Sequence, residues 1–215
     1  MLASYRTKAT SGIGPSGSLH ETARLLEHVN WRAGFASAPT SAAHSVPALR
    51  HLPIALARMG EGASPDMQEA VRAVIGYALW QTFYADSDWT RPFLADIACA
   101  TLVGPAGIVR SDEVALGLFL LGPHTTYHEH AHGLDEVYHV ASGRAEWRFD
   151  HELNRQAFGL GEIVHTERDQ RHDIRTGTAP ILCPYTWTND PAAVTYHRID
   201  RPWGVGKVVE PPLVG

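Results

Sequence analysis

The sequence predicts an α+β protein in which a mainly antiparallel β-barrel follows an α-helical N-terminal portion. Two features lead to this expectation. Before residue 93, apolar residues recur at spacings of three and four, as they do along one face of an amphipathic helix. After residue 93, short apolar or alternating runs are separated by Gly, Pro, Asp and Asn, which is typical of antiparallel strands joined by turns.

Two segments of the N-terminal portion have helical periodicity. Residues 18–35 begin with Ser18 and Glu21, which match a capping box. Residues 64–84 begin with Ser64 as a candidate N-cap, followed by a proline in the first turn. A proline-containing connector separates the two predicted helices.

Seven runs of the second portion predict strands. They are ACATLVG, VALGLFLLGP, EVYHVASGRAEWRFD, QAFGLGEIVHTE, HDIRTG, ILCPYTWT and AVTYHRID. The first residues are dominated by Gly, Ser and Thr, which favours a flexible segment. We therefore expect a flexible leader over residues 1–17, a helical portion over residues 18–92 that packs on the barrel, and the barrel itself over residues 93–215.

Charge and cysteine content exclude several classes of protein. A net charge of -5 and a pI near 6.2, without a basic run, argue against a nucleic-acid partner. No window reaches the roughly 18 apolar residues that a membrane span needs, so we expect a cytoplasmic protein without a membrane partner. The two cysteines, Cys99 and Cys183, lie far apart in apolar surroundings and predict buried free thiols.

Histidines gather at the start of the predicted barrel. Of the chain's 13 histidines, His130 and His132 are two residues apart, so on one strand both rings point to the same face. Glu136 can face the same interior if a short hairpin or bulge keeps the register. Imidazoles and a carboxylate inside a barrel are costly to desolvate unless a cation compensates them. The spacing therefore predicts a metal site.

Two motifs around these residues resemble those of the cupin superfamily of β-barrel proteins. The first motif is matched by Gly122, His130, His132, Glu136 and Gly143. The second is matched by Gly161 and His172, although Glu167 and Asp169 stand where the family has proline and glycine. The resemblance implies that His172 joins the other ligands from a later strand.

A closer resemblance adds two tyrosines. Tyr127 and Tyr138 flank the ligands, and together with His172 and the run ILCPYTWT they are similar to the cupin-type dimethylsulfoniopropionate (DMSP) lyases. These enzymes cleave DMSP to dimethyl sulfide and acrylate. The resemblance implies a carbon-sulfur lyase with a small-molecule substrate and one divalent transition metal ion, Fe, Mn, Zn, Ni or Co. Its ligands would be His132, Glu136 and His172, with His130 as a further ligand or close neighbour.

The implied reaction assigns roles to the aromatic residues. A β-elimination needs a base stronger than a carboxylate, and tyrosinate meets this requirement. We favour Tyr127 as the base and Tyr138 as a residue beside the metal, although the sequence does not separate the two. Aromatic faces attract a sulfonium cation, so Tyr185 and Trp187 are expected to line its pocket, and Tyr84 or Trp80 to close it.

Other functions remain open at this point. A cupin with these ligands can also be a dioxygenase or an isomerase, and a non-catalytic cupin can bind a small molecule without turnover. The lyase prediction depends on the two tyrosines, because a binding protein has no use for a strong base. The long apolar run VALGLFLLG is consistent with a homodimer in which a sheet edge is covered.

Overall fold

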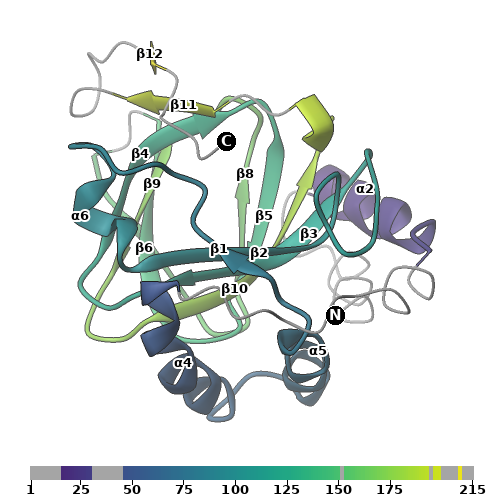
Figure 1. The fold of residues 1–215 in the computed structure, drawn as a ribbon, viewed down its shortest axis with the longest axis horizontal. Helices are drawn as coiled ribbons and strands as arrows, with labels where there is room; N and C mark the ends of the chain where they lie inside the picture. The colour runs from purple at the N-terminus through teal and green to yellow at the C-terminus, as the bar shows by residue number, and fades with distance from the viewer. Residues whose placement is uncertain (1–15, 31–45, 151–152, 194–195, 200–207, 210–215) are drawn as a thin grey trace.

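Two six-stranded sheets face each other in the computed structural model, which describes residues 16–30, 46–150, 153–193, 196–199 and 208–209 (Figure 1). The first sheet contains, in spatial order, β1 (Trp80–Gln81), β2 (Ile97–Val103), β3 (Ala115–Leu121), β10 (Ile181–Thr188), β5 (Asp135–His139) and β8 (Ile163–Thr166). The second contains β12 (Val208–Val209), β11 (Tyr196–Ile199), β4 (Thr126–His132), β9 (His172–Thr176), β6 (Arg144–Phe149) and β7 (Gln156–Gly159).

The chain alternates between the sheets, and all pairings between the named strands are antiparallel. From β3 it passes to β4 in the second sheet, back to β5, and again to β6 and β7 before it returns with β8. This alternation is the arrangement of a jelly roll. The predicted α+β class is confirmed, but the two described sheets are not closed into a barrel, because no ladder joins their edges.

The helices precede most of the strands, and their bounds differ from those expected. They are α2 (Ser16–Glu27), the 3-10 helix η1 (Pro47–His51), α4 (Leu52–Met59), α5 (Pro65–Ile75) and α6 (Arg91–Leu94), with a second 3-10 helix, η2 (Pro191–Ala193), near the end. Helix α2 begins before Ser18, so the predicted capping box is wrong. The predicted leader lies outside the described residues except for its last two positions, which belong to α2.

The second predicted helix is correct at its start and wrong at its end. The Ser64 hydroxyl accepts a hydrogen bond from the Met67 N–H at 3.3 Å, as an N-cap does. The helix stops at Ile75 because Gly76 caps it, and Trp80 then pairs with β2 in the first sheet. The proline-containing connector before α5 contains η1 and α4. The division at residues 92 and 93 stays a prediction.

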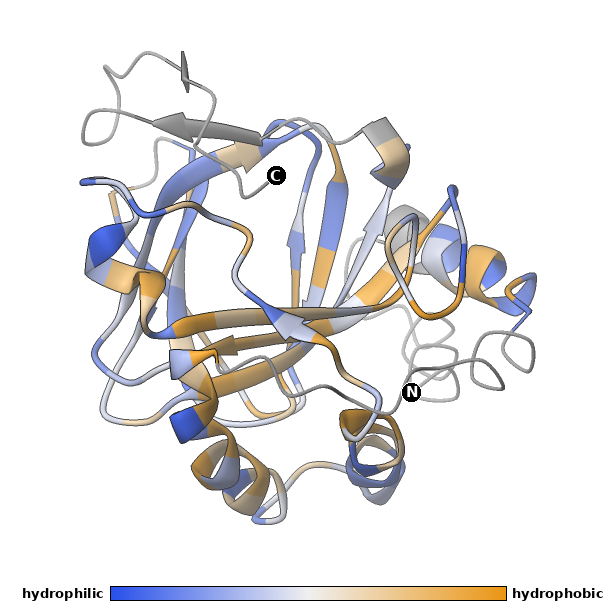
Figure 2. Cartoon of the chain, in the orientation of Figure 1, coloured by the Kyte–Doolittle hydropathy of each residue, from blue (hydrophilic) through white to orange (hydrophobic). Residues whose placement is uncertain are grey.

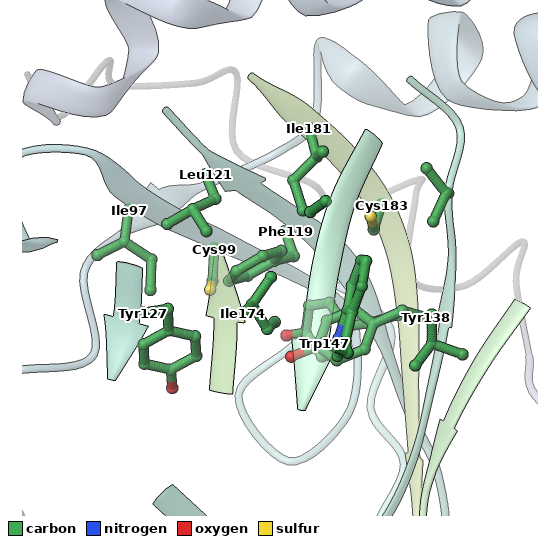
Figure 3. Packing of buried hydrophobic residues seen from close by; sticks show 14 of the residues in the cluster. Ile97, Cys99, Phe119, Leu121, Tyr127, Tyr138, Trp147, Ile174, Ile181 and Cys183 are labelled. Carbon is green, nitrogen blue, oxygen red and sulfur yellow. The ribbon is translucent and has the colours of Figure 1, made fainter. Parts of the chain in front are cut away.

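Strand β3 explains how the helices attach. All seven of its residues are buried, because Phe119 and Leu121 face the space between the sheets while Leu118 and Leu120 face the helices. Helices α4 and α5 lie along this outer face, and the strands beneath them are the most apolar of the fold (Figures 1 and 2). Between the sheets, Phe119 meets side chains of the second sheet such as Ile174 (Figure 3).

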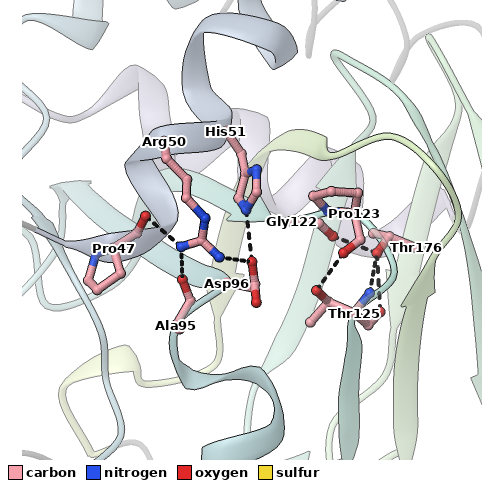
Figure 4. Close-up of polar contacts among 9 residues, drawn as sticks. All are labelled: Pro47, Arg50, His51, Ala95, Asp96, Gly122, Pro123, Thr125 and Thr176. Carbon is pink, nitrogen blue, oxygen red and sulfur yellow. Dashed lines mark hydrogen bonds and ion pairs between the residues drawn. The ribbon is translucent and has the colours of Figure 1, made fainter.

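A polar cluster ties η1 to the ends of β2 and β3 (Figure 4). Asp96 Oδ1 accepts hydrogen bonds from Arg50 Nη2 at 2.6 Å and from His51 Nε2 at 2.8 Å. Arg50 Nη1 also donates to the carbonyl of Ala95 at 2.8 Å. The Asp96 carbonyl accepts from the N–H of Gly122, where β3 ends. The cluster therefore fixes the helical layer against the sheet that forms one wall of the site.

Gly117 allows the closest approach between strands in the first sheet. A Cβ at this position would lie 2.6 Å from Tyr185 Cε1 and would also collide with the Ala100 carbonyl. We expect Gly117→Ala to lower the free energy of unfolding by about 2 to 3 kcal/mol, because neither the backbone nor the buried ring can give way. Urea unfolding measures this loss. Gly76→Ala is the control, because a Cβ there meets nothing within 4 Å, and an equal loss in both variants would contradict the packing argument.

Among the helices that the structure describes, none is both long and apolar enough to cross a membrane.

Candidate metal and catalytic centre

Three histidines meet in the space between the sheets. His130 and His132 come from β4 and His172 comes from β9, which pairs with β4 so that His130 lies opposite His172. One ring nitrogen from each lies within 4.8 Å of the others, and all three side chains are at most 2 % exposed. This spacing is short enough for one metal ion to contact all three nitrogens.

Glu136 reaches the histidines from the opposite sheet. Strand β5 belongs to the first sheet, so the short link after His132 carries the chain across the space rather than into a hairpin. Glu136 Oε2 accepts a hydrogen bond from His132 Nε2 at 3.0 Å and lies 3.6 Å from His172 Nε2. Its other oxygen, Oε1, accepts from Trp187 Nε1 at 2.6 Å. Trp187 thus holds the carboxylate in place beside the imidazoles.

Backbone carbonyls set the proton positions on two of the rings. His130 Nδ1 donates to the His128 carbonyl at 2.8 Å, and His172 Nδ1 donates to the Gln170 carbonyl at 2.9 Å. Because a carbonyl only accepts, the proton lies on Nδ1 and leaves the lone pair of Nε2 for a cation. Within the described chain, His172 Nε2 is buried without a hydrogen-bond partner. The cluster therefore fits a divalent metal ion.

The charges of the cluster lead to the same conclusion. Burial raises the pKa of Glu136, but the neighbouring His132 and His172 outweigh burial and hold that pKa below its usual range. Burial, with His172 and His132 beside it, lowers the pKa of His130. The site thus holds a buried negative carboxylate beside three imidazoles, and a metal cation would compensate that charge.

A β-bulge brings Tyr127 onto the same inner face. Strand β4 advances three residues from Tyr127 to His130 while β9 advances two, from Ile174 to His172. Without the bulge, positions 127 and 130 would face opposite sides of the sheet. With it, the rings of Tyr127 and His130 lie 4.2 Å apart between centroids, and the Tyr127 hydroxyl forms a short hydrogen bond with the Tyr84 hydroxyl.

Tyr138 lies on the far wall of the same space, next to Phe119 at 5.3 Å between ring centroids. Burial raises its pKa, and the nearby Glu136 carboxylate raises it further. In the absence of a cation, Tyr138 is therefore a neutral phenol.

These residues surround one small cavity. It is lined by Phe83, Cys99, Phe119, Tyr127, His130, His132, Glu136, Tyr138, Tyr185 and Trp187. The lining thus includes both tyrosines expected at the reaction centre, Tyr127 and Tyr138, and both residues expected to bind the sulfonium, Tyr185 and Trp187. It also includes three of the four expected ligands. The fourth, His172, contacts His130, with 4.1 Å between the ring centroids. Tyr84 stands behind Tyr127 rather than in the lining.

Trp80 is wrong as a residue that closes this cavity. Trp80 is on β1, opposite Ala100 of β2. Its side chain is on the outer face of the first sheet, where it packs in the cluster that includes Met59 of α4 and Leu118 of β3. The next position on β2, Cys99, faces the cavity instead. The sequence prediction also missed Phe83, Cys99 and Phe119. Strand alternation offered a signal for the last two, because Cys99 shares a face of β2 with Ile97 and Phe119 shares a face of β3 with Leu121.

Comparison with known proteins decides the family. The sequence model of the dimethylsulfoniopropionate lyase family matches residues 20–183. The chain belongs to this family. The predicted resemblance is thereby confirmed, and so is the predicted enzyme class, a carbon-sulfur lyase, at the level of the DMSP lyase family.

The proteins similar to this chain include two curated relatives and two solved structures. DMSP lyase DddQ of Ruegeria pomeroyi is 27% identical over 163 residues, which cover 74% of this chain and 81% of DddQ. DddL of Cereibacter sphaeroides is 28% identical over 144 residues, which cover 66% of this chain but only 59% of DddL. The crystal structure of DddQ from R. pomeroyi matches with a TM-score of 0.58 at 21% identity, over 89% of this chain and 95% of that chain.

A structure from a study of the DMSP lyases RdDddP and RnDddQII has the same TM-score, 0.58, at 24% identity, and covers 86% of this chain and 94% of that chain. At this level of identity the two structures support the fold.

The metal-free protein is expected to lose thermal stability as the pH falls below about 6.5. In the unfolded chain, histidine takes up a proton near that pH. Folding lowers the pKa of His130, so the folded state binds fewer protons than the unfolded state in this range. The free energy of unfolding therefore decreases as the pH falls. Thermal melts of chelator-treated protein from pH 8 to pH 5.5 measure this effect. His130→Gln should flatten the profile, and a melting temperature that rises toward pH 5.5 would contradict the assignment.

Proposed function

We propose that the protein is a metal-dependent lyase that cleaves DMSP to dimethyl sulfide and acrylate by base-initiated β-elimination. One observation carries the proposal. A single cavity is lined by two tyrosines, by histidine and glutamate ligands suited to a divalent metal, and by aromatic rings suited to a sulfonium. Membership of the DMSP lyase family favours this function over the dioxygenase, isomerase and binding-protein alternatives.

The metal ligands we propose are His130, His132, His172 and Glu136. A divalent transition metal ion bound by them would supply Lewis acidity to the substrate carboxylate, which makes the neighbouring carbon a stronger acid. The choice among Fe, Mn, Zn, Ni and Co is not determined by imidazole and carboxylate ligands. Trp187 contributes by holding Glu136 through its indole N–H.

Tyr127 is the base in this proposal. Its phenolate oxygen would take the proton from the carbon next to the carboxylate, the electron pair would form the double bond of acrylate, and the bond from the neighbouring carbon to sulfur would break. Tyr127 lies against His130 and has the Tyr84 hydroxyl as a partner, so a phenolate there has a donor in place. Tyr138, on the opposite wall beside Glu136, would orient the carboxylate.

The sulfonium end would lie against aromatic faces. The rings of Tyr185 and Trp187 are 5.0 Å apart between centroids, and both line the cavity. Burial raises the pKa of Tyr185, so it presents a neutral ring to the cation. These aromatic faces would attract the positive sulfonium.

The substrate requires the cavity to open. The volume of the cavity is about 20 Å³, which is room for roughly one water molecule. Phe83 and Trp187 are the lining residues that are only partly buried, and their ring centroids are 6.1 Å apart. Movement of these two side chains would admit the substrate, and their return would exclude water from the phenolate.

Product analysis tests the proposed reaction. Purified metal-loaded protein is incubated with DMSP, and acrylate is followed by proton NMR while dimethyl sulfide is followed in the headspace. We expect one acrylate for each dimethyl sulfide. Release of 3-hydroxypropionate in place of acrylate, or transfer of a methyl group without dimethyl sulfide, would reject β-elimination. The expected homodimer and the cytoplasmic location stay predictions.

A further inference from the structure

A second and larger hollow lies at the other end of β9 from His172. Its volume is about 720 Å³, within the usual range of ligand pockets, whereas the cavity at the histidines has about 20 Å³. It is formed where the end of α4 and the loop after it approach the start of β6 and the end of β9. None of its lining residues belongs to the metal cavity.

Two of the three arginines that line the hollow have no acidic partner among the described residues. Arg175 is paired with Glu146, with Nη2 at 2.5 Å and Nε at 3.0 Å from Oε2. The guanidinium groups of Arg58 and Arg144 have no ion-pair or hydrogen-bond partner among the residues that the structure describes. Both side chains are exposed and line the hollow. Besides Glu146, Glu61 is the one acidic residue among the described residues that line it. The lining is thus net positive in a chain whose net charge is -5.

The two free arginines come from different layers of the fold. Arg58 is in the last turn of α4, and Arg144 begins β6 in the second sheet. The layers are in close contact at the hollow, because a Cβ on Gly62 would lie 2.9 Å from Leu160 Cδ2. The two guanidinium groups are therefore carried by parts of the chain that pack on each other.

We propose that this hollow binds a small organic dianion, such as a dicarboxylate or a phosphate ester, between Arg58 and Arg144. A guanidinium group binds a carboxylate or phosphate through two parallel N–H donors, so two such groups match two negative charges. The lining also has apolar residues, Ala145, Leu160 and Ala179, that a short carbon chain can contact. A cationic substrate such as a sulfonium is disfavoured here. The proposal does not depend on the lyase activity.

Calorimetric titration of the metal-loaded protein tests the site, with inorganic phosphate and succinate as probes at constant ionic strength. We expect saturable binding of at least one probe, and the tighter one identifies the ligand class. Arg58→Gln/Arg144→Gln should weaken it at least tenfold. The matched control Arg72→Gln/Arg91→Gln removes two exposed arginines outside the hollow and should change it less than twofold.

Two further measurements distinguish anion binding in the hollow from anion binding by the metal, and from a loss of binding caused by unfolding. Binding should persist in His132→Ala, because anion binding by a metal would be lost with the metal. The melting temperature without anion should be the same in the double variant and in its control, and Arg144→Gln alone serves if the double variant unfolds. Absence of saturable binding in the unmodified protein, equal binding by the double variant, or loss of binding in His132→Ala would each overturn the proposal.

Discussion

Tyr127→Phe is expected to lower the rate of dimethyl sulfide release by about 10² to 10⁴ while the bound metal stays in place. The substitution removes only the phenolic oxygen, and a general base contributes a factor of this size. The ring keeps its contacts with Phe93, Phe119 and His130, so the fold and the metal ligands are undisturbed. Turnover and metal content, measured on the same preparation, give the two values that the prediction needs.

Two other tyrosines provide the controls for Tyr127. Tyr84→Phe removes the hydroxyl partner of Tyr127 and leaves its phenol, so we expect a loss of less than tenfold. Tyr138→Phe should impair substrate binding in addition to turnover, because Tyr138 lies beside Glu136 on the wall proposed to orient the carboxylate. Full turnover by Tyr127→Phe would transfer the base role to Tyr138.

Substitution of His132 or Glu136 should remove the metal and the activity together. In His132→Ala, the remaining ligands lose one of the three clustered imidazoles, and in Glu136→Gln they lose the carboxylate that is bonded to His132. Removal of an outer hydrogen-bond partner already weakens metal binding by about 10 to 100-fold. The loss of a ligand should exceed this factor. Metal content after dialysis, measured by elemental analysis, is the test.

His165→Ala is the control for the ligand variants. His165 is on β8, and its Nε2 lies 3.8 Å from Asp135 Oδ1 rather than in the histidine cluster. The variant should keep its metal and its turnover. If His132→Ala retained a full equivalent of metal, the proposed ligand set would be wrong.

The strand pattern made most of the sheet predictable. The runs that we expected to form strands cover β3 and β6 to β11, and they cover β2 and β5 except for the first residue of each. The helices were less predictable. Periodicity continued past Ile75 in the sequence, but Gly76 and the pairing of Trp80 with Ala100 ended the helix. Tertiary pairing overrides local periodicity at such a boundary.

The site was predictable where it depends on strand parity and unpredictable where it depends on a change of sheet. His130 and His132 share a face because they are two residues apart on one strand. Tyr127 joins them only through the bulge, and Glu136 only because the chain crosses to the other sheet after His132. Spacing placed Glu136 with the histidines only on condition that a hairpin or bulge kept the register, and Tyr127 came from the resemblance to the family alone. Phe83 had no signal of its own, because it lies in an irregular segment.

Headspace dimethyl sulfide from purified protein and DMSP, with and without chelator, tests the metal-dependent lyase proposal most directly. The chelator should abolish release, and addition of Mn(II), Fe(II), Zn(II), Ni(II) or Co(II) in separate samples should restore it with at least one metal. Release that persists at full rate in protein shown to be metal-free, or no release with any metal in folded and metal-loaded protein, would contradict the account.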